Sequence, residues 1–403
     1  MFGRVKSLDA ILATAEKKSL HRTLGAFQLT MLGIGAIIGT GIFVLTAEAA
    51  NKAGPAMMIS FVIAAVVCAL AALCYSELAS MVPVSGSAYT YSYATFGEIV
   101  AWIVGWALVL EYAIAASAVS VGWSGYMVSL AEEIFQVDIP NTFVKGPFDP
   151  VAAGETPGLI NIPAMLIGLV CMALLIVGTK ESARFNAVLV AIKVSALMLF
   201  LVLALPAVTG DNFEPFMPNG FFANNVVDPL TNEIVTVGVA AAAASIFFAY
   251  VGFDAVSTAA EETINPQRNI PIGLIGSLAI CTVIYMLVAA GAIGTLGAQP
   301  GGSLAQSDDA LAFVLREIGQ GWAGDLVAIA AGIALPSVIL MMMFGQTRIF
   351  FVMARDGLLP EVFSKLHPRY GTPHVVTACT GLFVALFAAL FPVGKLADIS
   401  NSG

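Results

Sequence analysis

Charged side chains are scarce in this sequence: Asp, Glu, Lys and Arg together make up 11% of its 403 residues. Soluble globular proteins carry about 25% of these residues and about 45–50% apolar ones. Here the apolar residues reach 59%, more than a soluble fold can bury. The composition therefore predicts a polytopic membrane protein whose first partner is the lipid bilayer. Because the formal net charge is −9, no basic surface is available for phosphates, and we predict no nucleic-acid partner.

Cysteine and histidine are also rare, with five and three residues respectively. The cysteines lie within apolar runs and lack the spacing of a metal site, so we interpret them as small buried hydrophobic residues. The histidines lie in or beside polar segments and do not cluster. We therefore predict no bound metal and no cofactor. The lack of a nucleophile–base pair or metal cluster also argues against an enzyme.

Apolar stretches long enough to cross a bilayer recur along the chain. A bilayer core needs roughly 20 apolar residues in helical form. Two polar loops, near 132–158 and 209–233, interrupt the pattern. After Pro392 only the beginning of a further stretch follows, so we expect the chain to end near the start of a tenth helix. The nine predicted spans are 27–49, 56–80, 98–131, 159–178, 185–208, 234–260, 272–297, 324–354 and 374–392.

Lysine and arginine are distributed unevenly between the two sides of these spans. If the odd-numbered spans run outward, twelve of the 17 Lys and Arg residues fall on one side and four on the other, with Lys193 inside a span. Short cytoplasmic loops are the ones enriched in Lys and Arg. The sequence therefore predicts a cytoplasmic N-terminus and a multi-pass protein of the plasma (inner) membrane.

The first span contains a cluster of glycines in GIGAIIGTGIF, residues 33–43. Each glycine weakens a helix by roughly 1 kcal/mol relative to alanine. A dinucleotide-binding GxGxxG pattern is excluded, because Ile38 stands at the third glycine position and no strand precedes it. Two interpretations remain: a helix-packing motif formed by Gly35 and Gly39, or a break of the helix in the middle of the membrane.

The sixth span has a comparable irregularity, where an aromatic run leads into Gly252 and the intramembrane carboxylate of Asp254. The two irregular spans are five helices apart, so they occupy equivalent positions in a five-plus-five arrangement. Paired interrupted helices in corresponding positions indicate the binding site of a secondary transporter. Unwound backbone is tolerated at that depth only where it is buried in protein or lines a cavity.

Unwound backbone offers two kinds of group to a ligand. The free N–H groups and positive dipole end of a half-helix suit a carboxylate, and free carbonyl groups suit an ammonium. Together they fit the α-carboxylate and α-amine of an amino acid. In the first span, whose centre is near Ile38, the N–H groups of Gly39 and Gly41 and the hydroxyl of Thr40 are the expected donors.

At this point a family resemblance becomes visible. GIGAIIGTGIF resembles the amino acid–polyamine–organocation (APC) superfamily, and FFAYVGFDAVSTAAEE at 247–262, followed by NPQRNIP, is similar to its bacterial-type cationic amino acid transporter branch. The same resemblance extends to PVSGSAYTYSYATFGE at 83–98, SARFNAVLVAIKV at 182–194 and GQTRIFFVMARDGLLP at 345–360. It implies an all-α membrane protein with a leucine-transporter-type five-plus-five inverted repeat, whose first and sixth helices are discontinuous.

The resemblance also implies a division of the chain and roles for residues. Residues 1–26 would form a cytoplasmic segment, 27–208 the first five-helix repeat, 209–233 an extracellular loop and 234–403 a second repeat, incomplete at its C-terminal end. The Phe248 ring would cover the substrate as a lid. The residues that would hold the amino acid are Ile37, Thr40 and Gly41 from the first helix, and the carbonyl groups of Phe248, Ala249 and Val251 from the sixth.

Three ionisable residues lie inside predicted spans, where a charge costs about 2.5–3.5 kcal/mol on insertion scales. In several transporters of the resembling fold a sodium ion bridges the first and eighth helices, and the ammonium group of Lys193 would occupy that place here. Because an ammonium can release and rebind a proton, we expect Lys193 to couple transport to protons; a purely structural buried amine is the alternative.

The other two are carboxylates. Glu111 on the third span is interpreted either as a carboxylate near the pocket, attracting cationic substrates or serving a proton network, or as a hydrogen-bond acceptor bracing the broken first helix. Asp254, just after the break of the sixth helix, is expected to cap the following half-helix or to act in gating.

The eighth span bears on the choice of substrate. It carries PSVILMMMFG at 336–345, and a methionine such as Met342 projecting into the site would favour a small neutral amino acid. Successive helical residues turn by about 100°, so at least one of the three consecutive methionines faces away. A cationic substrate would instead need Glu111 as its partner.

We therefore expect a secondary active transporter working by alternating access, as a proton-coupled symporter of a small neutral L-amino acid such as alanine. One alternative is transport or exchange of cationic amino acids (arginine, lysine, ornithine) or of polyamines. An alternative of another class is a sensor that binds amino acids without transporting them. A channel is disfavoured, because the two breaks form one occluded site. The oligomeric state is left open by the sequence.

Overall fold

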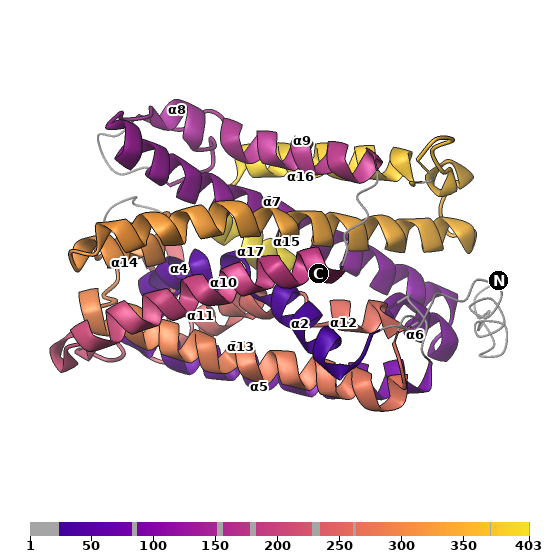
Figure 1. Ribbon diagram of the computed structural model, residues 1–403, viewed down its shortest axis with the longest axis horizontal. Coiled ribbons are helices and arrows are strands. Elements are labelled where there is room, and N and C mark those ends of the chain that lie inside the picture. The colour runs from indigo at the N-terminus through magenta and orange to yellow at the C-terminus, as the bar shows by residue number, and fades with distance from the viewer. Residues whose placement is uncertain are drawn as a thin grey trace.

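The computed structural model describes residues 24–82, 87–150, 156–177, 183–227, 234–260, 263–370 and 372–402. Within these ranges the chain is mostly helical, and the long helices run roughly parallel or antiparallel along one axis (Figure 1). The predicted segment 1–26 lies almost wholly outside the described residues, as do positions 83–86 and 228–233 of two predicted segments.

Five helical runs are long and apolar enough to cross a membrane, and shorter apolar helices stand at the other predicted spans. The first run, Leu45–Met81, contains two predicted segments, α4 (Leu45–Ala53) and α5 (Met57–Met81). Gly54 between them has φ +61°, a conformation in which the chain changes direction at low cost. The other four runs are Glu98–Phe135, Ala187–Ala207, Pro266–Leu296 and Gly321–Ala354, and the shorter helices are Ala26–Ile37, Ile162–Val177, Val239–Tyr250 and His374–Leu390.

The helices beyond these two elements follow in chain order. They are α2 (Ala26–Ile37), α3 (Thr40–Phe43), α6 (Ser87–Thr95), α7 (Glu98–Phe135), α8 (Asn141–Val144), α9 (Ile162–Val177), α10 (Ala183–Ala204), α11 (Val239–Phe247), α12 (Ala255–Thr258), α13 (Pro266–Leu296), α14 (Ala310–Glu317), α15 (Gly321–Arg355), α16 (His374–Leu390) and α17 (Val393–Ser400). Short 3₁₀ turns are η1 (Gly54–Ala56), η2 (Leu205–Ala207), η3 (Gly210–Phe213), η4 (Phe248–Tyr250), η6 (Leu304–Gln306) and η7 (Glu361–Ser364).

One predicted boundary is wrong. The sixth span was expected to begin at residue 234, but Ile234–Val237 forms strand β2, which pairs antiparallel with β1 (Asn224–Val227). The sequence Ile-Val-Thr-Val is rich in β-branched residues, which favour a strand over a helix. Gly238, with φ +112°, then turns the chain into α11, so the helical part starts at Val239.

The helices are arranged in layers. α7 packs along α15, and α9 and α16 form a second pair beside them (Figure 1). On the other side of the molecule α13 packs against both α2 and α5, and α10 contacts both α15 and α2. The short helix α17 packs mainly against α7 and also contacts α4 and α11. These contacts place the broken segments α2–α4 and α11–α12 inside the bundle.

Small residues fix the register of the α7–α15 pair. A Cβ on Gly105 would lie 2.6 Å from Met353 Sδ, and one on Gly345 would lie 3.3 Å from the Tyr112 ring. Glycines at membrane helix interfaces let the two backbones approach closely. The Trp123 indole N–H also donates to the Gly332 carbonyl at 2.9 Å. The middle of α7 therefore lies against the middle of α15.

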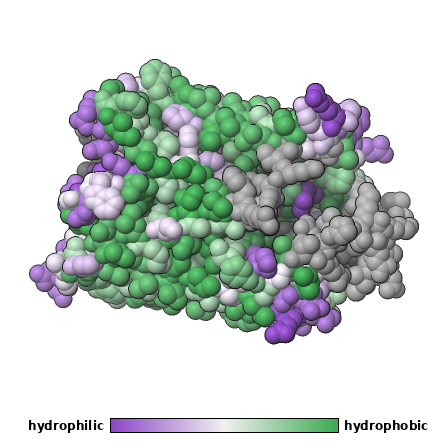
Figure 2. All heavy atoms as spheres, in the orientation of Figure 1, coloured by the Kyte–Doolittle hydropathy of each residue, from purple (hydrophilic) through white to green (hydrophobic). Residues whose placement is uncertain are grey.

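Polar residues gather at the two ends of the molecule, and hydrophobic residues cover the part between them (Figure 2). One end carries α6 and the end of α15, and the opposite end carries α8 and α14 (Figure 1). We call these ends the α6 side and the α14 side. A chain with this apolar middle part and several helices of membrane-spanning length is a multi-pass membrane protein.

Candidate functional site

The first span is interrupted at the glycine cluster, as predicted. α2 ends at Ile37, Ile38 has the extended torsions φ −71° and ψ 98°, and helical structure resumes at Thr40. The first N–H groups of a helix have no acceptor within the helix. The break therefore presents the N–H groups that follow Gly39 toward the interior of the bundle. The side chain of Thr40 lies outside the described part of the structure, so its hydroxyl contact stays a prediction.

The sixth span is interrupted over a longer stretch. α11 ends at Phe247 and passes through the 3₁₀ turn η4 to Val251, whose ψ of 135° leaves the helical region. Gly252 has φ +103°, which only glycine adopts without strain, and α12 starts at Ala255. Both interruptions that the sequence indicates are thus present in the structure.

The two interruptions contact each other directly. A Cβ on Gly41 would collide with the Cα atom of Ala249, so only glycine allows the approach. Met342 and Val338 of α15 lie beside them: a Cβ on Gly252 would lie 3.1 Å from Met342 Cε, and one on Gly39 would lie 3.5 Å from Val338 Cγ1. Unwound backbone from both repeats and apolar side chains of α15 therefore meet in one place.

A tyrosine from α13 joins the two unwound segments. The Tyr285 hydroxyl lies 2.8 Å from the Ile37 carbonyl oxygen and 3.1 Å from the Ala249 carbonyl oxygen. Ile37 precedes the first break and Ala249 lies in the second. Sequence analysis missed Tyr285, because no motif marks it and its partners are 248 and 36 positions away.

Lys193 lies where the sequence analysis expected it, against the first helix. Its side chain is 1% exposed, and its ammonium nitrogen donates to the Gly35 carbonyl oxygen at 3.0 Å. Gly35 lies in the last turns of α2, just before the break. The position fits both interpretations of Lys193, so its role in proton coupling stays a prediction.

The two intramembrane carboxylates lie near each other on the α6 side of the breaks. Asp254 occupies the N-cap position of α12 but makes no capping hydrogen bond with its side chain; the Tyr112 hydroxyl donates to it instead. Glu111 is half-buried, and Asp254 and Cys68 are within electrostatic range of its carboxylate. Its backbone carbonyl accepts a hydrogen bond from Ser400 of α17 at 3.1 Å.

The remaining predicted residues are buried at the breaks. Phe248 is 5% exposed, and its carbonyl oxygen accepts a hydrogen bond from the Val251 N–H at 3.1 Å. Met342 is 4% exposed and packs on Gly252, so it faces inward as expected. Val338, one turn earlier, was missed. Its place near the centre of the eighth span, four residues before Met342, was the available signal.

On the α14 side, a group of charged and polar side chains covers the breaks. The ammonium nitrogen of Lys52 lies 3.1 Å from Glu48, 3.2 Å from Asp398 and 2.6 Å from the Ser245 hydroxyl, which itself donates to Asp398 at 2.5 Å. We call Glu48, Lys52, Ser245 and Asp398 the Lys52 cluster. It joins α4, α11 and α17, and the sequence gave no sign of it, because Lys52 and Asp398 are 346 positions apart.

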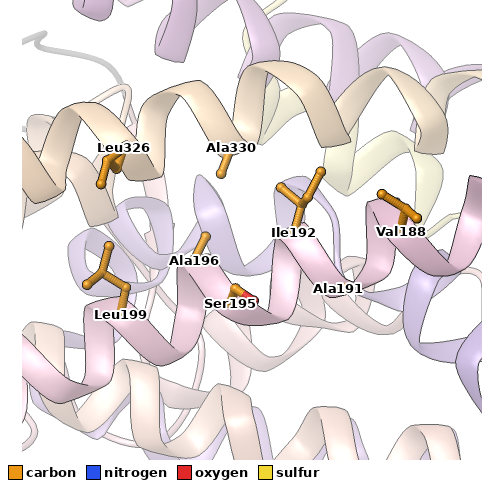
Figure 3. Close-up of a pocket in the computed structure, with 8 residues that line it drawn as sticks. All are labelled: Val188, Ala191, Ile192, Ser195, Ala196, Leu199, Leu326 and Ala330. Carbon is orange, nitrogen blue, oxygen red and sulfur yellow. The ribbon is translucent and has the colours of Figure 1, made fainter.

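A groove outside this site runs along the surface between α10 and α15. It has a volume of about 400 Å³ and is lined by Val188, Ala191, Ile192, Ser195, Ala196, Leu199, Leu326 and Ala330 (Figure 3). These side chains belong to the outer face of α10, whereas Lys193 of the same helix is buried against α2. None of the predicted site residues lines this groove.

Comparison with known proteins agrees with this geometry. The model of the amino acid permease family matches residues 24–401. The chain is 46% identical to the branched-chain amino acid permease BcaP of Bacillus subtilis and 44% identical to the methylthioribose transporter of the same organism, covering 99% of this chain and 82% of each relative. It is 36% identical to the cationic amino acid transporter 4 of Homo sapiens, over 96% of this chain and 58% of that one.

A solved structure with the same architecture is that of a Na⁺-coupled sialic acid symporter in a substrate-bound, outward-open state. It aligns with a TM-score of 0.58 at 14% sequence identity and covers 94% of this chain and 78% of that one. At this identity the likeness concerns the fold alone. It confirms the leucine-transporter-type all-α fold that the sequence predicts.

Proposed function

Because the chain belongs to the amino acid permease family, we propose that it carries a neutral aliphatic L-amino acid across the membrane by alternating access, in symport with a proton. Family membership and the transporters among its relatives make it a transporter and not an enzyme. The observation that carries the proposal is the contact of the two breaks, where Gly41 meets Ala249. This contact brings backbone donors and acceptors from both repeats within reach of one small ligand.

The proposed ligand is a zwitterion. Its carboxylate would accept hydrogen bonds from the N–H groups of the first break, at Gly39 to Gly41, where the helix dipole favours a negative charge. Its ammonium would donate to carbonyl oxygens of Ile37 and of the sixth-helix break. Phe248, buried in η4 beside these atoms, would act as the lid that separates the ligand from the α14 side.

Apolar side chains support a neutral aliphatic substrate. Val338 and Met342 both project from α15 toward the breaks and leave no polar partner for a substrate side chain there. We expect the methionine to limit the length of the substrate, which favours alanine. A branched aliphatic side chain is the upper size we consider, in keeping with the printed substrate of the 46%-identical relative.

A cationic amino acid is the second candidate. It is favoured by Glu111, a half-buried carboxylate on the α6 side of the breaks, with a second carboxylate, Asp254, within electrostatic range. A long cationic side chain reaching past the breaks would find both charges. For this candidate Glu111 binds the substrate, whereas for a neutral substrate it does not.

The proposed coupling ion is the proton, carried by Lys193. The support is its burial and its contact with the Gly35 carbonyl, which tie its charge to the last turns of α2. A change of protonation there alters the electrostatic environment of the first break. We place the α6 side in the cytoplasm, because the four Lys and Arg residues predicted to be extracellular, namely Lys52, Lys145, Arg316 and Lys395, all lie on the α14 side.

Uptake by the purified chain in proteoliposomes tests the proposal. Radiolabelled alanine, leucine, arginine and methylthioribose are compared with and without an inward proton gradient. Uptake of alanine or leucine that rises with the gradient is the expected result. Preference for arginine selects the second candidate, and uptake of methylthioribose alone contradicts an amino acid substrate. Lys193→Ala that retains full gradient dependence contradicts the role of Lys193, and binding without uptake selects the sensor alternative.

A further inference from the structure

Three oxygen atoms from three helices meet at the breaks with few hydrogens between them. They are the Ile37 carbonyl oxygen of α2, the Ala249 carbonyl oxygen of η4 and the Tyr285 hydroxyl oxygen of α13, with the hydroxyl 2.8 and 3.1 Å from the two carbonyls. A tyrosine hydroxyl carries a single hydrogen, so it can satisfy only one of the two carbonyls at a time.

The two carbonyls have no other backbone partner in the part of the chain that the structure describes. Around the first break, the Ile38 N–H donates to Ile34 and the Phe43 N–H to Gly39, so neither serves Ile37. Around the second break, the Val251 N–H donates to Phe248 and the Phe253 N–H to Tyr250, so neither serves Ala249. The three oxygens together therefore have more acceptor capacity than the one hydroxyl hydrogen can use.

The tyrosine ring is held so that its hydroxyl cannot easily leave. Tyr285 is 0% exposed, the Tyr250 ring lies 5.4 Å from it between centroids, and the Phe61 ring packs edge-on at 5.9 Å. A buried polar group of fixed position costs free energy unless it is fully hydrogen-bonded. Three fixed oxygens with one hydrogen suit a ligand that brings several hydrogens and a positive charge.

Resting on the proposed function, we propose that Tyr285 is a substrate-binding residue, whose hydroxyl oxygen accepts one N–H of the substrate ammonium while the Ile37 and Ala249 carbonyls accept the others. A primary ammonium has three N–H donors, one for each oxygen. The site then requires a primary amine, and a substrate of similar size without one binds poorly. This requirement separates amino acids from sugar-like substrates such as methylthioribose.

The test compares two tyrosine-to-phenylalanine variants that keep the aromatic rings. Tyr285→Phe removes the proposed ligand atom. Tyr250→Phe is the matched control, because its hydroxyl also bonds a backbone carbonyl, that of Phe61 at 3.3 Å, and its ring touches Tyr285. For each variant we would measure the melting temperature in detergent, KM and maximal rate for the amino acid that the wild type transports best, and inhibition by its 2-hydroxy analogue.

The expected result is a KM raised about ten- to hundredfold in Tyr285→Phe, the range for a lost hydrogen bond to a charged group. Inhibition by the 2-hydroxy analogue changes less than twofold, and Tyr250→Phe leaves KM within twofold of the wild type. A KM for Tyr285→Phe that matches Tyr250→Phe overturns the inference while leaving amino acid transport intact. Equal losses for the amino acid and the hydroxy analogue, with a lowered melting temperature, also overturn it and assign Tyr285 a structural role. A wild type that binds methylthioribose and no amino acid contradicts the proposed function itself.

Discussion

The two sides of the site are held together by different chemistry. On the α14 side the Lys52 cluster joins three elements through two ion pairs, of 3.1 and 3.2 Å, around a lysine side chain that is 12% exposed. On the α6 side the described contacts are between phenols and carboxylates: Tyr112 donates to Asp254, and Tyr89 donates to Asp356 at 3.0 Å. Ion pairs respond to salt and to loss of one partner, whereas a phenol–carboxylate bond keeps a neutral donor.

The difference teaches where each side spends charge. The Lys52 cluster links α4 and α11, the second half of one broken helix and the first half of the other, to α17. Opening the α14 side must therefore separate opposite charges. Opening the α6 side needs only the release of a hydroxyl from a carboxylate. We expect the α14 side to be the more strongly closed of the two, and the following predictions test that expectation.

Lys52→Ala has the largest expected effect. Removing one partner of a largely buried ion pair leaves unpaired charge, which costs about 3 kcal/mol. The melting temperature falls, and a cysteine introduced at Ile42, which is 0% exposed, reacts at least about tenfold faster with a membrane-impermeant thiol reagent, the rate following the raised population of the open form. Both are measured in a background without the native cysteines.

Lys145→Ala is the matched control for this variant. Lys145 pairs with Asp308 on the same side, but the atoms are 3.9 Å apart and the side chains are 33% and 67% exposed. Exposed pairs contribute about 0–1 kcal/mol. If Lys52→Ala and Lys145→Ala behave alike in both assays, the Lys52 cluster does not close the α14 side.

A pH change has the next largest effect, through Asp149 in the loop after α8. Burial raises the pKa of Asp149 from 3.8 to about 6, although the Gly146 N–H donates to its carboxylate and opposes the shift. The stability that its protonation contributes is present below about pH 3.8 and is lost as the pH rises through about 6. We expect a loss of about 2 kcal/mol across this window. Thermal melts of the wild type and Asp149→Asn at pH 5 and pH 7.5 check this: the variant loses the dependence, and an unchanged dependence rules Asp149 out.

Tyr112→Phe has a smaller effect, on the α6 side. The variant removes the neutral donor to Asp254 and keeps the ring against Gly345. We expect a loss of about 1 kcal/mol in stability. Reaction of the Ile42→Cys reporter from the α14 side stays unchanged, because the Lys52 cluster is intact. Tyr370→Phe, at a 40% exposed position, is the control. Faster labelling of the reporter in Tyr112→Phe contradicts the separation of the two sides.

Salt has the smallest effect. Raising the ionic strength from 0.05 to 0.5 M screens the half-exposed carboxylates of the Lys52 cluster and weakens it by about 0.5 kcal/mol. The reporter on the α14 side then reacts about twofold faster in the wild type and shows no salt response in Lys52→Ala. An equal salt response in both chains means that the screened charges lie elsewhere.

Sequence reasoning located what depends on local composition. Glycines at 39, 41 and 252 weaken helices wherever they stand, so both breaks were predictable, and the depth of Lys193 followed from the apolar residues around it. The strand at Ile234–Val237 was misassigned, because a short run of β-branched residues at the start of a long apolar stretch has no period of its own.

Contacts between distant segments were out of reach. Lys52 and Asp398 become neighbours only when α4 and α17 pack side by side, and Tyr285 reaches Ile37 only through the packing of α13 on α2. The choice between Val338 and Met342 at the breaks depends on the rotation of α15, which its nearly uniform hydrophobicity does not reveal.

The contact between the breaks is the centre of the account, and substrate binding by Gly41→Ala tests it most directly. The added Cβ would collide with Ala249, whereas a Cβ on Gly276, the control position, would meet Thr30 at an ordinary 3.5 Å. We would measure the dissociation constant of the transported amino acid for both variants, each shown to be monodisperse. The account predicts a loss of at least about hundredfold for Gly41→Ala and wild-type affinity for Gly276→Ala. Wild-type affinity in Gly41→Ala would contradict it, because the substrate would then bind elsewhere.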